Sequence, residues 1–290
     1  MTHVPVLLEP ALELLAIRTG GVYVDATFGA GGHSAAILER LGDGRLIALD
    51  ADPSAAAWAR AILDPRLTFV NANFRELAHV LDRCGVESVD GVLFDLGVSS
   101  MQFDDAERGF SVGKTAPLDM RMNPHSGRSA YDVLATASEG ELADIFFLYG
   151  EERSARRIAH VIVERRSAGA LPTTTTEFAS LVSGILHRPG RRERIHPATR
   201  VFQALRIAVN DELDSLRDGL NVAIDRLRVA GRVVAMSFHS LEDRIVKRTF
   251  RGDSRLEILT KKPLVPGNRE MSENPRARSV KLRAARRKAS

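Results

Sequence analysis

Cysteine and long apolar runs are what this sequence has least of. One cysteine, Cys84, stands among 290 residues, so an intrachain disulfide and a thiolate metal cluster within one chain are both excluded. No apolar run approaches the ~20 residues that a membrane-spanning helix needs. The first residues also lack the basic and apolar regions of a secretory signal. We therefore expect a cytoplasmic protein with no membrane partner and no metal site.

The overall composition is that of a folded protein. Hydrophobic residues make up 44% of the chain and charged residues 27%, which excludes a disordered tail protein and a collagen-like repeat. The length suffices for one large domain or two modest ones. The net charge is only +4, but the isoelectric point is about 9.5 and the arginines are clustered, so a polyanionic partner is compatible with the composition.

Apolar segments alternate with helical ones in the first third of the chain. Expected strands lie at residues 22–28, 45–50, 67–70 and 89–96, and helices separate them. This alternation predicts an α/β fold with a mainly parallel sheet covered on both faces. The next strand, 232–238, comes too late for a single crossover helix, so residues 104–197 are expected to form an inserted helical subdomain and 199–227 the crossover. A helix at 242–250 and strands at 255–259 and 279–284 complete the pattern.

A glycine-rich turn follows the first expected strand. It nearly fits G-x-G-x-x-G from Gly29, with Ser34 where the third glycine belongs. Asp50 closes the second strand 19 residues after Gly31 (50 − 31), the spacing of a carboxylate that accepts hydrogen bonds from a ribose. Asp52 is an alternative for that role. Together the loop and the acid indicate an adenosine-containing ligand: NAD, FAD or S-adenosylmethionine.

A second polar segment, FDLGVSS at residues 94–100, ends the fourth strand. In doubly wound sheets, ligands bind outside the carboxyl ends of the strands. Asp95 is therefore expected on the same edge of the sheet as Gly31 and Asp50, where its carboxylate could hold a polar group of the substrate.

Nine segments of the chain match one family pattern. They are 3–8 (HVPVLL), 25–34 (DATFGAGGHS), 95–100 (DLGVSS), 105–111 (DAERGFS), 117–122 (PLDMRM), 149–153 (YGEER), 196–200 (HPATR), 237–244 (SFHSLEDR) and 274–279 (NPRARS). With these segments the chain resembles the bacterial 16S ribosomal RNA cytosine-N4 methyltransferase family (MraW/RsmH), and the resemblance spans nearly the whole chain.

The resemblance implies a class I methyltransferase, a Rossmann-like seven-stranded sheet with an antiparallel last strand. Residues 1–103 and 198–290 would form the methyltransferase domain, and residues 104–197 a helical RNA-recognition subdomain. It also implies methyl transfer from S-adenosyl-L-methionine to N4 of a cytidine in the decoding region of 16S ribosomal RNA, within the small ribosomal subunit. The family's cofactor-binding positions fall on Gly31, Gly32, His33, Asp50, Phe74, Asp95 and Gln102.

The expected chemistry centres on Asp95 and His239. The amino nitrogen of cytosine is a poor nucleophile, so the enzyme must place it in line with the methyl group and aim acceptors at its N–H bonds. Asp95, with the backbone carbonyls of residues 96–98, is the candidate acceptor. The Pro-Pro-aromatic sequence of many amino-methylating enzymes is missing after Asp95, so another side chain must hold the base. Phe110, Phe238 and His239 are candidates, and the last two are preferred because they end a strand.

Two runs of cations are candidates for contact with RNA phosphates. Arg188, Arg191, Arg192 and Arg194 lie in the expected insert, and seven further cations lie between residues 276 and 288. Either run could instead be a solvated face.

Three other functions share part of these features. An NAD-dependent dehydrogenase would explain the glycine loop and Asp50 but not Asp95 or the cationic tail. A non-catalytic RNA-binding protein would have no use for the whole cofactor set, and a DNA amino-methyltransferase is disfavoured only by the resemblance.

Overall fold

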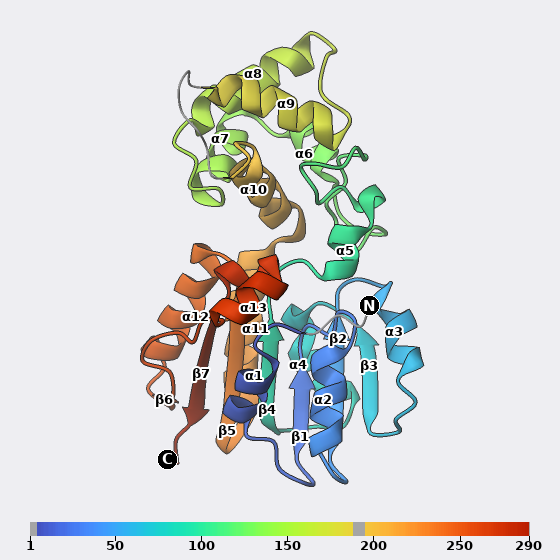
Figure 1. Cartoon of the computed structure of the whole chain (residues 1–290), viewed down its shortest axis with the longest axis vertical. Helices are drawn as coiled ribbons and strands as arrows, with labels where there is room; N and C mark the ends of the chain where they lie inside the picture. Colours follow the sequence, from blue (N-terminus) through green and yellow to red (C-terminus); the bar gives the residue numbers. More distant parts are fainter. Residues whose placement is uncertain (1–4, 188–194, 290) are drawn as a thin grey trace. The chain divides into compact units, whose positions relative to one another are not determined.

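The computed structural model describes residues 5–187 and 195–289, and within them seven strands form one sheet (Figure 1). Their order is β3-β2-β1-β4-β5-β7-β6. Neighbours from β3 to β5 pair in parallel, whereas β7 is antiparallel to both β5 and β6. This confirms the predicted class I methyltransferase sheet with an antiparallel last strand. The strands are β1 Val22–Asp25, β2 Arg45–Asp50, β3 Leu67–Asn71, β4 Val89–Asp95, β5 Leu227–Ser237, β6 Leu256–Ile258 and β7 Lys281–Arg287.

The chain divides into two compact units, and the sheet belongs to the first, residues 1–97 and 213–290. Its central strand β4 is almost wholly buried, as expected for a parallel strand covered on both faces. The helical elements of this unit are α1 Leu8–Leu15, α2 Gly32–Arg40, α3 Ala55–Ala61, η1 Phe74–Glu76, α4 Leu77–Arg83, α11 Glu212–Arg226, α12 Ser240–Gly252, α13 Asn268–Glu273 and η3 Pro275–Ser279.

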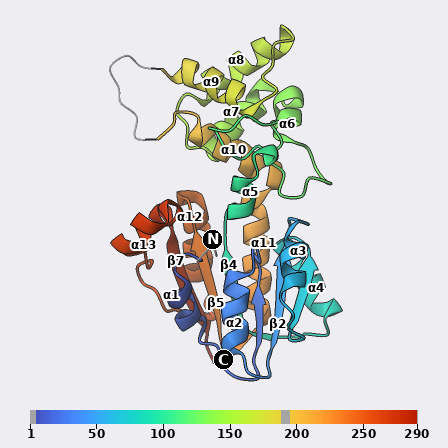
Figure 2. The same cartoon turned by 45° about the vertical axis from the view of Figure 1, so that its right-hand side comes forward.

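Helices α1 and α2 share one hydrophobic cluster against the sheet. Leu12 and Leu15 of α1 meet Ile37 and Leu38 of α2 over β1, β4 and β5. Figures 1 and 2 show both helices in front of the strands. The sequence did not predict α1, whose flanking residues Leu7 and Ala16 both have a left-handed backbone.

The second unit, residues 98–212, is helical. The four helices expected inside the insert are present as α6 Ala130–Thr136, α7 Glu139–Leu148, α8 Ala155–Ser167 and α9 Thr175–Leu186. Capping boxes begin three of them: Ser129, Ser138 and Thr174 each accept the N–H of an acidic residue three positions later. The unit also contains α5 Ser100–Asp104, η2 Ala106–Arg108 and α10 Thr199–Asn210.

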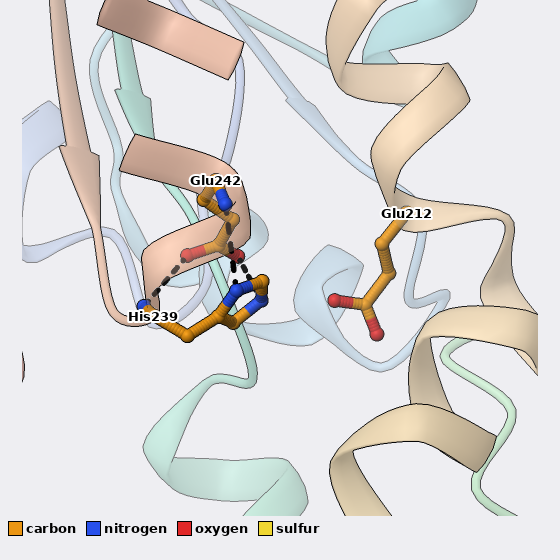
Figure 3. A group of neighbouring side chains, drawn as sticks. All are labelled: Glu212, His239 and Glu242. Atoms are coloured by element: carbon orange, nitrogen blue, oxygen red, sulfur yellow. Dashed lines mark hydrogen bonds and ion pairs between the residues drawn. The ribbon is translucent and has the colours of Figure 1, made fainter. Parts of the chain in front are cut away.

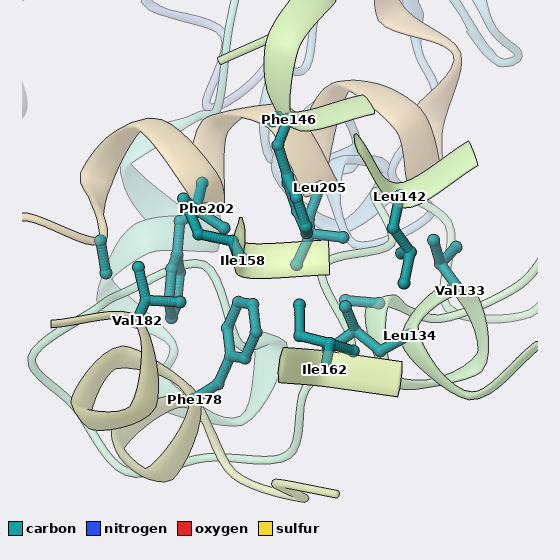
Figure 4. Packing of buried hydrophobic residues seen from close by; sticks show 14 of the residues in the cluster. Val133, Leu134, Leu142, Phe146, Ile158, Ile162, Phe178, Val182, Phe202 and Leu205 are labelled. Carbon is teal, nitrogen blue, oxygen red and sulfur yellow. The ribbon is translucent and has the colours of Figure 1, made fainter. Parts of the chain in front are cut away.

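The compact helical unit is longer than the segment expected from the sequence. It begins at residue 98 rather than 104 and ends at 212 rather than 197. The main reason is α10, expected as part of the crossover, whose apolar stripe instead packs into the helical core. Figure 4 shows Phe202 and Leu205 of α10 beside Phe146, Ile158 and Phe178.

In the part of the chain that the structure describes, no helix combines the length and the apolar content needed to cross a bilayer.

Candidate active site

The glycine loop joins β1 to α2 through a tight turn. Gly31 has a φ of 80°, and a Cβ there would lie 2.7 Å from the Phe28 ring; at Gly32 it would lie 2.5 Å from Pro5. Ser34, in place of the third glycine, donates its hydroxyl to buried Asp25 at 2.7 Å. The loop therefore needs glycine for close packing, and Ser34 secures the start of α2 to the end of β1.

Asp50 holds this loop against β2. Its Oδ2 accepts the Gly29 N–H at 2.7 Å, and its Oδ1 accepts the Asp52 N–H at 2.8 Å. Burial, which outweighs these hydrogen bonds, raises the pKa of Asp50 to about 6. The alternative, Asp52, is 2% exposed and accepts the Ser54 N–H at 2.9 Å in the turn before α3. Asp50 is thus the acid that contacts the glycine loop, while Asp52 shapes the next turn.

Asp95 ends β4 beside the glycine loop. Its N–H donates to Thr27 Oγ1 at 2.6 Å, and its Oδ2 lies 3.5 Å from Nδ1 of His33. The other carboxylate oxygen, Oδ1, is buried and has no hydrogen-bond partner among the described residues. A buried carboxylate oxygen in that state is costly unless a ligand supplies a donor or a positive charge.

Three carboxyl groups share this part of the sheet edge. Burial first, then the negative charges of Asp25 and Glu242, raises the pKa of Asp95 to about 8. Burial also raises the pKa of Asp25 to about 6, although Ser34 and the Thr27 N–H oppose that shift. A bound cation would favour ionisation of all three groups, so the cluster is electrostatically complementary to a positively charged ligand.

The backbone after Asp95 approaches the end of β5. Gly97 has a φ of 91°, and a Cβ there would lie 3.4 Å from the Phe238 ring. Phe238 is partly buried. The structure therefore places Phe238 at the carboxyl edge with Asp95, as the sequence predicted.

His239 is engaged by Glu242 at the start of α12 (Figure 3). Its Nδ1 accepts the Glu242 N–H at 3.4 Å, while Nε2 lies 3.2 Å from Glu242 Oε1. In return Glu242 Oε2 accepts the Phe238 N–H at 2.7 Å. This is a helix-capping arrangement that also orders the end of β5. Glu212, drawn in the same figure, ends the helical unit and pairs there with Arg206 at 2.8 Å.

The structure also places Phe74, Gln102 and Phe110, the remaining residues predicted to bind cofactor or base. Phe74 begins η1, and its ring lies 5.7 Å from that of Phe94, edge to face. Gln102 and Phe110 belong to the helical unit. Gln102 is buried and forms the capping box of α5 with Ser99. Phe110 is 6% exposed within the helical core, so its ring has no open face for a base in this structure.

The structure describes one of the two predicted cation runs. Arg188, Arg191, Arg192 and Arg194 lie outside the described residues. Residues 281–287 of the tail form β7, where three of the cations contact the protein: Arg283 contacts Asp243 at 2.7 Å, Arg286 contacts Glu257 at 2.6 Å, and Arg287 donates to the Ile224 carbonyl at 2.9 Å.

Two residues at this edge had no role in the sequence interpretation. Thr27 anchors Asp95, and Glu242 caps α12 while raising the pKa of Asp95. Only Glu242 had a usable signal, since it follows His239 by three positions, the spacing of a capping box.

The family model and curated proteins of similar sequence identify the same family for this chain. The model of the MraW methylase family matches residues 1–288. "Ribosomal RNA small subunit methyltransferase H" of Thermomicrobium roseum is 49% identical over 99% of this chain and 94% of its own length. Proteins with the same name from Heliobacterium modesticaldum and Geobacter sulfurreducens are 49% and 50% identical, each over 98% of this chain and 97% and 98% of their own lengths.

Proposed function

The chain belongs to the MraW methylase family, and from that premise we propose that it methylates N4 of a cytidine in 16S ribosomal RNA, using S-adenosyl-L-methionine. Its partner is then the small ribosomal subunit or its RNA, and its place of action is the cytoplasm, where ribosomes assemble. The observation that carries the proposal is the unsatisfied, buried Oδ1 of Asp95 within a carboxylate cluster.

The residues of the sheet edge fit the cofactor. Asp50 offers carboxylate oxygens beside the glycine loop for ribose hydroxyls, as the family positions suggest. The cluster of Asp25, Asp95 and Glu242 suits a cation, and S-adenosylmethionine carries a sulfonium. Gly31, Gly32, His33 and Phe74 complete the proposed cofactor positions in the sheet unit, and Gln102 is the one proposed from the helical unit. When bound, the cofactor supplies an electrophilic methyl group.

In the proposed mechanism the protein positions and polarises the cytosine amine. Asp95 Oδ1 accepts a hydrogen bond from N4–H, and this bond strengthens as positive charge develops on the attacking nitrogen. Backbone carbonyls of residues 96–98 are the candidate second acceptors. Phe238, beside Gly97, is the proposed contact for the base. His239 contributes by holding the end of β5 and the start of α12, which makes it a positioning residue.

The helical unit is proposed to recognise RNA, with Arg188, Arg191, Arg192 and Arg194 as candidate phosphate contacts. Replacing these four arginines with glutamine should raise the KM for RNA and flatten its salt dependence, because each lost phosphate contact removes a share of counterion release. Cofactor affinity should stay the same. A salt dependence equal to that of the wild type would show that this run is a solvated face.

The test of the proposed function is the identity of the product. Labelled S-adenosylmethionine is offered to small ribosomal subunits, naked 16S ribosomal RNA and DNA, and the methylated nucleoside is identified after digestion. We expect N4-methylcytidine from a ribosomal substrate. Label in DNA, or in a different ribonucleoside, would contradict the proposal.

A further inference from the structure

The outer face of α12 carries four cations and no acid. They occupy positions i, i+3, i+4 and i+7, which lie on one side of a helix, and all are exposed: Arg244, Lys247, Arg248 and Arg251. The opposite side is buried in the sheet unit through Leu241, Ile245, Val246 and Phe250. We call these four cations the α12 stripe. Because its apolar side is already occupied, α12 has no hydrophobic face left to offer a membrane.

The acids of α12 and its neighbours are already engaged. Glu242 is 3% exposed and caps the helix, and Asp243 pairs with Arg283 and Lys281 at 2.7 and 3.3 Å. On the flanking β6 and its preceding turn, Glu257 pairs with Arg286 and Asp253 with Arg255.

Three cations of the α12 stripe are exposed to solvent and have no partner within the part of the protein that the structure describes. Among the described residues, Lys247, Arg248 and Arg251 form no ion pair or side-chain hydrogen bond with another part of the protein. Two further exposed lysines, Lys261 and Lys262, follow β6, which packs against α12. A group of solvated cations without counter-charges attracts polyanions over several ångströms.

The stripe starts close to the proposed reaction edge. Helix α12, orange in Figure 1, begins one residue after His239, and β5 pairs with β4 so that Met236 is opposite Asp95. Arg244 follows His239 by five residues (244 − 239), about 7.5 Å of helix axis, and Arg251 lies about 10.5 Å further on. The stripe could therefore follow a phosphodiester backbone that leads away from a cytidine held at Asp95.

We propose that the α12 stripe binds the RNA backbone next to the target cytidine. The inference rests on the proposed function. It adds an RNA-binding surface on the sheet unit, where the sequence analysis predicted RNA contacts only for the cations of residues 276–288. Charge complementarity selects the occupant: a continuous run of phosphates matches a row of exposed cations, three of which have no partner in the described ranges of the protein, without requiring any sequence-specific contact.

The test compares two triple variants with equal loss of charge. The first is Lys247→Gln, Arg248→Gln and Arg251→Gln. The control is Arg40→Gln, Arg60→Gln and Arg83→Gln, three exposed cations in the last turns of α2, α3 and α4. Binding of a naked 16S RNA fragment is measured over a range of salt concentrations, together with methyl transfer and cofactor affinity for each protein.

For the stripe variant we expect the negative slope of log affinity against log salt to become less steep by about 2 to 3, corresponding to three lost phosphate contacts. Its KM for RNA should rise, while its cofactor affinity stays at the wild-type value and the control keeps the wild-type slope. A conservative variant, Lys247→Arg with Arg248→Lys and Arg251→Lys, should restore the slope.

An unchanged slope in the stripe variant, or an equal loss in the control, would overturn the inference. A wild-type slope would show that the RNA binds elsewhere, and an equal loss would show an effect of net charge alone. Failure of the proposed function is read separately, as absence of methyl transfer to RNA by the wild-type protein.

Discussion

The carboxylate cluster should make binding of S-adenosylmethionine strongly dependent on pH. Desolvation of its carboxyl group, followed by the negative charges of Asp25 and Glu242, raises the pKa of Asp95 to about 8. If the sulfonium binds the ionised form of Asp95, the apparent affinity follows the ionised fraction. With the pKa at about 8, that fraction rises from about 3% at about pH 6.5 to about 76% at about pH 8.5. The dissociation constant should therefore fall about 25-fold over this interval.

Two other sources of pH dependence can be separated from Asp95. Asp25 and Asp50, with pKa values of about 6, are mostly ionised at the lower end of the interval and contribute little. The α-amino group of the ligand itself titrates near pH 8 and affects every variant equally. Calorimetric titration of Asp95→Asn measures that background, and the extra dependence of the wild type on pH belongs to Asp95.

The same titrations contain the refuting result. S-adenosylhomocysteine has no sulfonium, so the pH dependence of its affinity should be nearly the same for the wild type and Asp95→Asn. If wild type and Asp95→Asn show parallel pH profiles for S-adenosylmethionine, the ligand's charge is not balanced by Asp95. The proposed placement of the sulfonium near the carboxylate cluster would then be wrong.

Three further predictions follow from contacts at the sheet edge. Asp50→Ala should weaken S-adenosylmethionine binding roughly tenfold or more, since a hydrogen bond to a charged group contributes ~1.5–3 kcal/mol; unchanged affinity in calorimetry would assign the ribose to another residue. His239→Ala should lower the free energy of unfolding by about 0.5–2 kcal/mol in urea titrations because α12 loses its cap, and His239→Asn should retain most of it; a stable but inactive His239→Ala protein would instead indicate a direct catalytic role. Without ligand, the free energy of unfolding should decrease as the pH rises from about 5 to about 8, because the raised pKa values of Asp25, Asp50 and Asp95 make the folded state bind more protons than the unfolded state in this range. Asp95→Asn should flatten that decrease above about pH 6, and a slope identical to the wild type would contradict the raised pKa of Asp95.

The sheet was predictable because its signals are local. Each parallel strand is a short apolar run followed by a polar turn and a helix, so β1 to β4 and the edge that carries Asp50 and Asp95 could be inferred from spacing alone. Helix α1 has apolar residues at helical spacing, Ala11, Leu12 and Leu15, but no capping signal, since its N-cap residue is Leu7.

The roles of individual side chains could not be predicted from the sequence, because they depend on tertiary contacts that residue spacing does not encode. The composition of the tail suits RNA binding, but Asp243 and Glu257 lie beside Arg283 and Arg286 in the structure. Likewise, the spacing from His239 to Glu242 suits both a catalytic histidine and a capping box, and only the contact geometry distinguishes them. Phe110 could not be told from a base-stacking aromatic because its burial depends on helices distant in sequence.

The most direct test of the central claim is the single-turnover rate of Asp95→Asn with saturating S-adenosylmethionine and RNA. Saturation removes any difference in ligand affinity, so the measured rate reports methyl transfer itself. The account predicts formation of N4-methylcytidine at a rate lower by about 10²–10³ than the wild-type rate, as for other hydrogen bonds that strengthen in a transition state. A rate near that of the wild type would remove Asp95 from the chemistry and leave backbone carbonyls as the acceptors of the amine hydrogens.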